Sequence, residues 1–591
     1  MNCDFRNVLI LLTMFLKLIP KPIFIRAIIL FSISIVMLSN SLLLFTTNSS
    51  TFIMWDMLSI NSSYITIPVI FDPWGILFSS VVCFISANVI LFSNSYIKSE
   101  KPLIRFIHLV LLFVLSINLL IFIPRIISLL LGWDGLGLVR FILVIYYQNN
   151  KSLAAGIITA LTNRVGDVLI LLRIGWTVSQ GHWLILNIWY RVLHINNVII
   201  ILLIFAAITK SAQVPFSSWL PAAIAAPTPV SALVHSSTLV TAGVFILLRF
   251  YPFLAKFHIF NILLLIFGSI TILIAGMAAI AEVDIKKIIA LSTLRQLGVI
   301  ITRLRLGLTL LTFFHLITHA LFKALLFICA GSLINLHHHS QDIRNIGNSI
   351  NSLPSTISSL LIANIALCGF PFLAGFYSKD AIIESSLFIS WNPIIRYIFI
   401  FSTALTAAYS TRFIISVNLG FPSSLPTSPI NDTDTYITNP TFNLTLGAIL
   451  AGSITNWLSL TPTQEIPLSL MQKTSALIVT LAGLYLAINL SKIKISCKNP
   501  LYSIFPKIHI SLVYMWLLVS LSTQKILNFP FKLSLSSIKS LDQGWYEIWG
   551  PQGVFTSLSA VSSSIILFQK ETINKILIIS SLIYLISMLI Y

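Results

Sequence analysis

The chain has 591 residues, of which 57% are hydrophobic and only 9% are charged, and its mean hydropathy is +0.96. A soluble protein of this length needs a far larger charged surface, so the composition excludes a soluble globular fold and predicts a membrane protein. The formal net charge is +19, but the cations are dispersed among apolar runs rather than gathered on one basic face, which argues against nucleic-acid binding.

Apolar runs long enough to cross a bilayer recur from Phe24 to Tyr591. A helical crossing takes about 20 apolar residues, whereas a transmembrane barrel shows short alternating strands. We therefore predict an all-α polytopic membrane protein with about 15–16 transmembrane helices. The predicted segments, in chain order, are 24–46, 75–97, 104–124, 126–147, 153–176, 196–211, 229–250, 258–281, 285–302, 308–335, 354–375, 377–390, 393–419, 441–458, 473–493 and 508–522. A polar loop lies near 420–440, and a polar-interrupted stretch continues to about 570 before a last apolar segment at 573–591.

Two predicted helices are interrupted by proline and glycine beside a lysine. Pro215, Pro221, Pro227 and Pro229 follow Lys210, and a run with Gly369, Pro371 and Gly375 precedes Lys379. Proline removes a backbone donor, and within a bilayer the freed groups are tolerated only against protein or water. Paired broken helices of this kind are typical of transporters that carry ions near the midplane, although a simple kink or loop is the alternative.

Lys210 ends a continuous apolar run, so it is not a lysine that reaches the membrane surface from a helix end. A lysine at the centre of a membrane helix costs about 2.5–3.5 kcal/mol on insertion scales. Desolvation lowers the pKa of a lysine and a nearby carboxylate raises it, so a lysine with a movable acidic neighbour can act as a proton switch. A fixed salt bridge or a loop lysine is the alternative.

Asp134 is the carboxylate that we expect to pair with Lys210, because Gly132, Gly135 and Gly137 around it permit close helix approach. His235, on the next helix, has the near-neutral titration that suits a proton relay, although a lone histidine is often structural.

His315, His319 and Lys323 are spaced four residues apart and therefore line one stripe of a helix that is otherwise apolar. We interpret this stripe as a proton path; a metal pair is the alternative, but no third ligand accompanies the histidines on the helix. Lys379 and Asp380 are expected at the start of a helix, where they would end the path. Asp167 and Asp284 are supporting acidic candidates, and Asp284 precedes Ile-Lys-Lys as a helix-end residue does.

No cofactor or metal site is predicted on this chain. The cysteines (Cys3, Cys83, Cys329, Cys368 and Cys497) are scattered singly, and neither a Cys-x-x-Cys pair nor a Gly-x-Gly-x-x-Gly turn is present. If the protein serves a redox enzyme, the redox groups lie on other chains.

Together these segments resemble the antiporter-like membrane subunits of mitochondrial NADH–ubiquinone oxidoreductase, respiratory complex I. The motifs that carry the resemblance are GWDGLGLV (132–139), NRVGD (163–167), the proline-rich stretch 209–243, DIKKIIALSTL (284–294), FFHLITHALFKALLF (313–327), QDIRNIG (341–347) and GFYSKD (375–380). The C-terminal LDQGWYEIWG (541–550) favours the chain 5 family over its shorter paralogues.

The resemblance implies two inverted five-helix repeats, each with a broken helix, and a long lateral helix near 520–570. It divides the chain into N-terminal helices (1–103), a first repeat (104–282), a second repeat (283–420), C-terminal helices (421–522), and a lateral amphipathic helix with a terminal anchor (523–591). It places Asp134 where many relatives have the glutamate that pairs with the broken-helix lysine, and it makes His235 and Lys323 central relay groups.

The function that follows from the resemblance is proton translocation, coupled to electron transfer from NADH to ubiquinone on other subunits. The expected cofactors (NADH, FMN, iron–sulfur clusters and ubiquinone) lie on those subunits, and the expected partners are the other membrane-arm subunits and the lipid of the mitochondrial inner membrane. A subunit of a multisubunit sodium/proton antiporter, and a scaffold whose charges only hold helices together, are the rival interpretations.

Three arginines do not fit a membrane protein. Arg140 and Arg295 stand inside motifs where the resemblance implies serine, and Arg173 lies in an apolar run. The chain has only 9 methionines, and Ile224 stands where relatives often have methionine. We hypothesise that the sequence was translated with a code unsuited to its organelle, so that serine codons are written as arginine and methionine codons as isoleucine.

Overall fold

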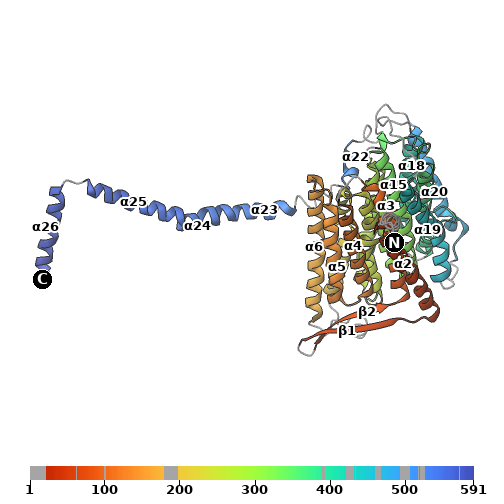
Figure 1. The fold of residues 1–591 in the computed structure, drawn as a ribbon, viewed down its shortest axis with the longest axis horizontal. Coiled ribbons are helices and arrows are strands. Elements are labelled where there is room, and N and C mark those ends of the chain that lie inside the picture. The colour runs from red at the N-terminus through yellow and green to blue at the C-terminus, as the bar shows by residue number, and fades with distance from the viewer. Residues whose placement is uncertain are drawn as a thin grey trace, which may run out of the picture. The chain divides into compact units, whose positions relative to one another are not determined.

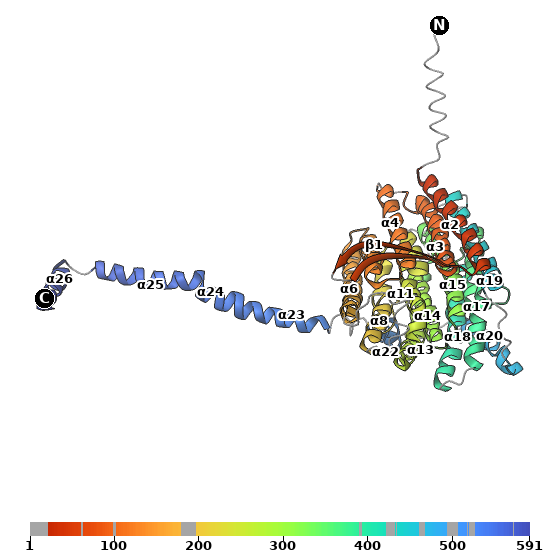
Figure 2. The same cartoon turned by 90° about the horizontal axis from the view of Figure 1, so that it is seen from below.

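The computed structural model describes residues 22–60, 63–98, 102–178, 197–337, 339–388, 393–420, 432, 434–459, 467–492, 506–516, 518, 526–570 and 573–590. The chain forms two compact units, Met1–Leu518 and Val519–Tyr591. The first unit is a bundle of helices with one β-hairpin, and the second is a series of helices with few internal contacts (Figures 1 and 2).

The long helices of the first unit follow the predicted segments closely. They are α2 (Pro22–Thr47), α3 (Pro73–Tyr96), α4 (Leu103–Phe122), α5 (Ile126–Val144), α6 (Asn150–Val178), α8 (Asn197–Lys210), α11 (Leu239–Arg249), α13 (His258–Ala281), α14 (Ile285–Leu304), α15 (Thr309–Leu336), α16 (Pro354–Cys368), α17 (Ala374–Phe388), α18 (Pro393–Ile414), α19 (Thr435–Ser459) and α20 (Leu470–Lys492). The predicted helical membrane bundle is thereby confirmed.

Within the described residues, 11 helices are long and apolar enough to cross a membrane, and shorter apolar helices occur at Asn197–Lys210, Pro354–Cys368 and Lys575–Ile590. This is fewer full-length spans than the 15–16 predicted, because α8, α16 and α17 are short and the longer α14 and α19 contain several charged or polar residues. The segment predicted at 508–522 is also different: α22 (Pro506–Val513) is short, and Met515 and Trp516 then take positive φ angles of 51° and 60°.

A β-hairpin was not among the predicted elements. Strands β1 (Thr51–Ile60) and β2 (Ser63–Phe71) pair antiparallel from Thr51 opposite Phe71 to Ile60 opposite Ser63, with an irregularity between Asp56 and Leu58. The hairpin lies across one end of the helix bundle in both views (Figures 1 and 2). The hairpin lies between the predicted helices 24–46 and 75–97. Its strands have 10 and 9 residues, so neither is an apolar run long enough to be predicted as a membrane helix.

Both predicted helix breaks are present. After α8 the chain passes through a cis peptide bond before Pro215, the short α9 (Trp219–Ala222) and the 3₁₀ turn η1 (Ala223–Ala225), and only then resumes as α10 (Thr228–Leu233). The π-helical segment η2 (Val234–Thr238) joins α10 to α11. At the second break α16 ends at Gly369, whose φ of +83° is the left-handed conformation that glycine adopts without steric penalty.

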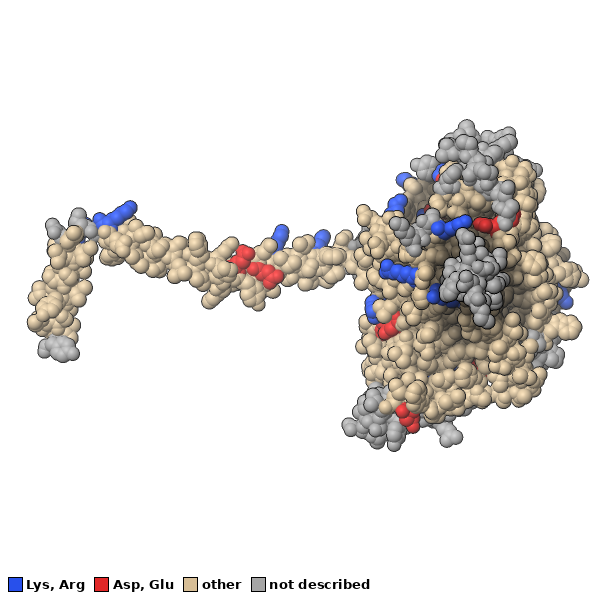
Figure 3. Space-filling view, in the orientation of Figure 1, with Lys and Arg blue, Asp and Glu red and all other residues tan. Residues whose placement is uncertain are grey.

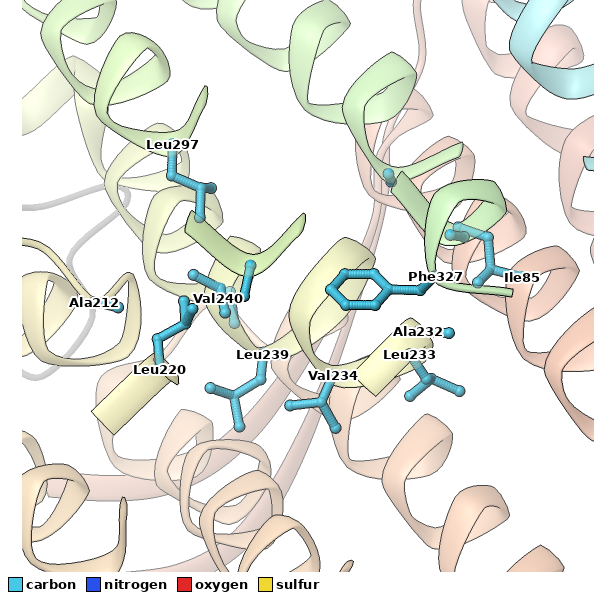
Figure 4. Close-up of a cluster of buried hydrophobic side chains, with 14 of the residues drawn as sticks. Ile85, Ala212, Leu220, Ala232, Leu233, Val234, Leu239, Val240, Leu297 and Phe327 are labelled. Carbon is cyan, nitrogen blue, oxygen red and sulfur yellow. The ribbon is translucent and has the colours of Figure 1, made fainter. Parts of the chain in front are cut away.

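The main hydrophobic core extends through the bundle from α2 to α19, and its central part lies where the first broken helix meets α15. Helix α15 contacts α3, α10, η2, α14, α16, α17 and α19, so it runs through the middle of the bundle. Figure 4 shows Val234, Leu239 and Val240 of the broken helix, with Leu297 of α14 and Phe327 of α15. A bundle whose central helix is enclosed in this way can keep polar groups away from lipid.

The outer surface of the first unit is largely apolar. On the face drawn in Figure 3, charged side chains are few and scattered over the described residues. Leu131, Ile157 and Leu171 of α5 and α6 are each more than half exposed. Such a surface is suited to lipid or to neighbouring membrane proteins.

The second unit consists of α23 (Ile526–Ser537), the π-helical η6 (Ile538–Trp545), α24 (Tyr546–Trp549), α25 (Pro551–Gln569) and α26 (Ile573–Ile590). Residues Leu527–Gln569 form one helical stretch of 43 residues with no buried positions. A long helix at the predicted place is therefore present.

Candidate functional site

Lys210 is the last residue of α8 and has no exposed surface. Its Nζ donates to the Trp133 carbonyl oxygen at 3.0 Å and lies 4.5 Å from the centre of the Trp133 ring. The helix ends here because Ala212 takes a positive φ of 54° and Pro215 follows. The broken helix thus holds a cationic group within the bundle, against a backbone carbonyl of α5.

The acidic partner of this lysine is arranged differently from the prediction. Within the described residues no ion pair joins Asp134 to Lys210, and Asp134 Oδ1 has no hydrogen-bond partner there. Asp167 instead accepts a 2.7 Å hydrogen bond from the Trp133 indole nitrogen, and it forms an ion pair with Arg164 at 3.3 Å. Trp133 therefore bridges Lys210, through its carbonyl, and Asp167, through its indole.

A cavity of about 180 Å³ adjoins this arrangement, and its lining includes Asp134, Asn163, Arg164 and Asp167. A water molecule occupies roughly 30 Å³ of liquid, so a space of this size, lined in part by these polar side chains, has room for water. The carboxylates of Asp134 and Asp167 can therefore contact water in this cavity.

His235 lies in the π-helical segment η2 and is 1% exposed. Its ring is 6.4 Å from the ring of Phe327 on α15, and its Nδ1 has no hydrogen-bond partner in the described structure. π-Helical turns are frequent at functional sites, where they turn a side chain out of the regular helical stripe. Here the turn brings an imidazole against the central helix.

His315, His319 and Lys323 line one stripe of α15, as predicted, and all three are buried. The two imidazole rings are 6.3 Å apart. Lys323 Nζ donates to the Ser292 hydroxyl of α14 at 2.5 Å, whereas neither ring nitrogen of His319 has a hydrogen-bond partner among the described residues.

His315 is held from two sides by residues that the sequence reasoning did not single out. Its Nδ1 is 2.9 Å from the Ser378 hydroxyl of α17, and its Nε2 is 3.3 Å from Gln296 Oε1 of α14. An amide oxygen only accepts, so this geometry places the proton of the neutral ring on Nε2 and leaves Nδ1 to accept from Ser378. Ser378 also contacts the Thr318 hydroxyl at 3.1 Å.

Lys379 is buried in α17, where its Nζ donates to the Cys368 carbonyl at 2.7 Å and to the Thr406 hydroxyl at 3.3 Å. Lys379 and Asp380 were expected to start a helix, but α17 begins at Ala374, so they lie in its second turn. The left-handed turn at Gly369 presents the freed carbonyl of Cys368 to the lysine.

The remaining candidates lie outside this arrangement. Asp284 is at the N-terminal end of α14 and pairs with Lys287 at 2.9 Å, which confirms its interpretation as a helix-end residue. His337 and His339 follow the end of α15, and His338 lies outside the described residues. In the described part of the chain, no group of three metal-ligating side chains comes together.

Chemically, the site is a row of buried amines and imidazoles contributed by α8, η2, α15 and α17. Each described lysine of the row has an oxygen partner, but no direct hydrogen bond joins Lys210 to His235 or His235 to Lys323 in the described structure. Groups spaced in this way can pass a proton only through intervening water or hydroxyls.

Comparison with known proteins gives matches over nearly the whole chain. Residues 124–406 match the family model of the NADH:quinone oxidoreductase/Mrp antiporter transmembrane region, and residues 409–591 match that of the NADH dehydrogenase subunit 5 C-terminus. NADH-ubiquinone oxidoreductase chain 5 of Lumbricus terrestris is 48% identical over 94% of this chain and 96% of that protein. The protein of the same name from Rattus norvegicus is 35% identical over 98% of this chain and 94% of that protein.

Solved structures with a similar fold include the Mrp complex from Dietzia sp. DQ12-45-1b, with a TM-score of 0.72 and 22% identity over 91% of this chain and 60% of that chain. The membrane-bound sulfane sulfur reductase, an archaeal respiratory membrane complex, gives a TM-score of 0.67 and 18% identity over 93% of this chain and 97% of that one. At these identities the likeness concerns the fold.

Proposed function

Because the chain belongs to the family of NADH-ubiquinone oxidoreductase chain 5, it is a proton-translocating membrane subunit of that oxidoreductase, and we propose that its row of buried amines and imidazoles is the proton path. The path begins at Lys210, with Asp134 and Asp167 beside it. It continues through His235 to Lys323, His319 and His315 on α15, and it ends at Lys379 and Asp380. The observation that carries the proposal is the buried Lys210 amine, held at a helix break on the Trp133 carbonyl at 3.0 Å.

The redox chemistry lies on other subunits in this proposal. Electron transfer from NADH to ubiquinone would alter the charge around Asp134 and Asp167, and thereby the protonation of Lys210. Moving one charge against the membrane potential requires about 2.3 kcal/mol per 100 mV, which is comparable with the effect of placing one charge beside a buried amine. The chain is a multi-pass membrane protein within a multisubunit complex. We place that complex in the mitochondrial inner membrane, with the other membrane-arm subunits of complex I as its partners.

The further division of the chain into two inverted repeats, 104–282 and 283–420, is part of the same proposal. The two helix breaks support it, because each comes with a buried lysine that donates to a backbone carbonyl: Lys210 to Trp133 of α5, and Lys379 to Cys368 at the end of α16.

The test is Lys210→Ala in the intact complex, reconstituted in vesicles, with Lys98→Ala as the control because Lys98 is exposed. We expect fewer protons moved per NADH oxidised with Lys210→Ala and no change with the control. An unchanged ratio would refute the role of Lys210. A reduced amount of assembled complex with a normal ratio would instead favour a scaffold, and sodium-dependent transport without electron transfer would favour the antiporter function.

A further inference from the structure

Arg140, Arg173 and Arg295 lie deep in the bundle with almost no surface: Arg140 and Arg173 are 0% exposed and Arg295 is 1% exposed. No nitrogen of Arg140 or Arg173 has a hydrogen-bond partner in the described structure. Arg140 Cζ lies 3.8 Å from the centre of the Trp219 ring, and Arg173 Cζ lies 5.4 Å from that of Phe250. Arg295 donates to the Ser402 hydroxyl at 3.2 Å but has no carboxylate within ion-pair distance among the described residues.

Other arginines of the same chain donate to carboxylate or backbone oxygens. Arg249 holds both oxygens of Asp72, at 2.5 and 3.1 Å. Arg344 pairs with Asp342 at 2.5 Å, and Arg412 donates to the backbone carbonyls of Ile280 and Glu282. A guanidinium has five N–H donors and stays protonated in proteins, so burying one without acceptors is among the least favourable events in a membrane fold. Arg303, which is 1% exposed, likewise donates to the backbone carbonyls of Ile382 and Ala381. Arg140 and Arg173 differ from all of these because none of their guanidinium nitrogens has a partner in the described structure, and Arg295 is intermediate, with one hydroxyl partner.

Arg140 and Arg295 also stand beside the proposed proton path. The charge of Arg140 acts on both Lys210 and His235. The charge of Arg295 acts on Lys323, His315 and Lys379. A permanent positive charge at each place would repel a proton from the neighbouring amines and imidazoles. Both charges therefore oppose the protonation of a path whose groups must be protonated in turn.

A serine satisfies every one of these positions. Buried serines in this chain regularly donate to the carbonyl three residues earlier, as Ser116 does to Phe113 at 2.7 Å and Ser292 to Ile289 at 2.6 Å. A serine at 140 or 295 would find the carbonyl of Gly137 or Ser292 in the same relation. Its hydroxyl can both donate and accept, and it leaves room for water beside the path.

We propose that the protein as made in its organelle carries serine at positions 140, 173 and 295, because the codons written here as arginine are read there as serine. The small number of methionines, 9 in 591 residues, fits the same cause, with methionine codons written here as isoleucine. The burial of the three arginines supports serine whatever the chain does. The repulsion between their charge and the neighbouring amines supports serine only if the proposed proton path is correct.

Peptide mass spectrometry of the native complex tests the identity, after digestion with chymotrypsin and with a lysine-specific protease. We expect serine at 140, 173 and 295, and arginine at the matched control positions 249, 344 and 412. Arginine at 140, 173 or 295, or serine at any control position, would overturn the proposal. Mass spectrometry identifies the residues without any measurement of activity. If it finds arginine at these positions, the proposed proton path is still tested separately by the Lys210→Ala experiment.

A second measurement compares Arg140 with Arg140→Ser, and Arg173 with Arg173→Ser, in complexes assembled from a recoded gene. Because serine carries no charge to repel a proton from Lys210 or His235, we expect Arg140→Ser to raise the number of protons moved per NADH. Position 173 serves as the control, because its aromatic neighbour is Phe250 and its charge is not among those acting on Lys210 or His235. Equal proton ratios for Arg140 and Arg140→Ser would overturn the claim that a charge at 140 opposes protonation of the path.

Discussion

Each buried lysine of the site contacts a neutral oxygen rather than a carboxylate. Lys210 donates to the Trp133 carbonyl, Lys323 to the Ser292 hydroxyl and Lys379 to the Cys368 carbonyl. A carboxylate at contact distance would lock an amine in its charged form, whereas a dipole supports the charge without fixing it. The carboxylates stand one group further away, as Asp167 does behind the Trp133 indole. This arrangement is consistent with amines that gain and lose a proton.

Ser378 gives a prediction at the same scale. Ser378→Ala removes the hydroxyl that faces His315 Nδ1 at 2.9 Å, and a buried group left without its partner loses about 1–3 kcal/mol. We expect slower coupled turnover with the complex still assembled, measured as NADH-driven proton uptake by vesicles. Ser386→Ala is the control on the same helix, because the Ser386 hydroxyl bonds only to the Ile383 carbonyl. Equal slowing by both variants would show that α17 packing, not the His315 contact, is responsible.

At this scale the sequence was a good guide to the titratable groups and a poor one to their partners. Lys210, His315 and Lys323 stand out because a charge in an apolar run is rare. Ser292 and Ser378 do not, because serine is common in these helices and only the packing of α14 and α17 against α15 shows which hydroxyls face the path. The Asp134–Lys210 pair was proposed from small neighbouring residues, which indicate close helices but not which carboxylate is nearer.

At the scale of elements, the helix breaks were predictable because proline and glycine act locally. The hairpin of β1 and β2 was not, since its strands are stabilised by pairing with each other and have no 20-residue apolar run. The predicted segment at 508–522 was wrong in length for a related reason: its composition is apolar, but Met515 and Trp516 turn the chain. Tertiary context decides such elements.

The packing of α17 against α16 depends on Gly375. A Cβ at this position would lie 1.8 Å from the Ala366 carbonyl oxygen, which is backbone and cannot move aside easily. We expect Gly375→Ala to destabilise the break by about 1–3 kcal/mol, the usual range for overpacking, and to lower the amount of assembled complex on native gels. Gly175→Ala is the control, because a Cβ there meets nothing within 4 Å. Normal assembly with Gly375→Ala would contradict the close approach.

At the scale of the whole molecule, the two units differ in how much they bury. The first unit, Met1–Leu518, buries polar side chains among its helices, whereas the described residues of the second unit, Val519–Tyr591, include no buried position. The helices that pack around α15 all belong to the first unit, so we expect this unit to fold in a membrane without contacts from other chains. In the second unit, Phe529, Trp549 and Phe568 are each more than two-thirds exposed, and Leu527–Gln569 has no buried position. An isolated apolar helix of that length is stable only against lipid or other proteins.

Removing residues 519–591 should therefore separate two properties that most substitutions change together. Because the packing around α15 lies within Met1–Leu518, we expect the shortened protein to insert and to resist proteolysis in membranes as the full chain does. We expect the shortened protein to be lost from the assembled complex, because it lacks the exposed apolar surface of the second unit through which partners would bind. Blue-native electrophoresis gives the association, and limited proteolysis of membranes gives the fold. A shortened chain that still co-migrates with the complex would show that the first unit carries the contacts, and one that is degraded in the membrane would show that the two units are not independent.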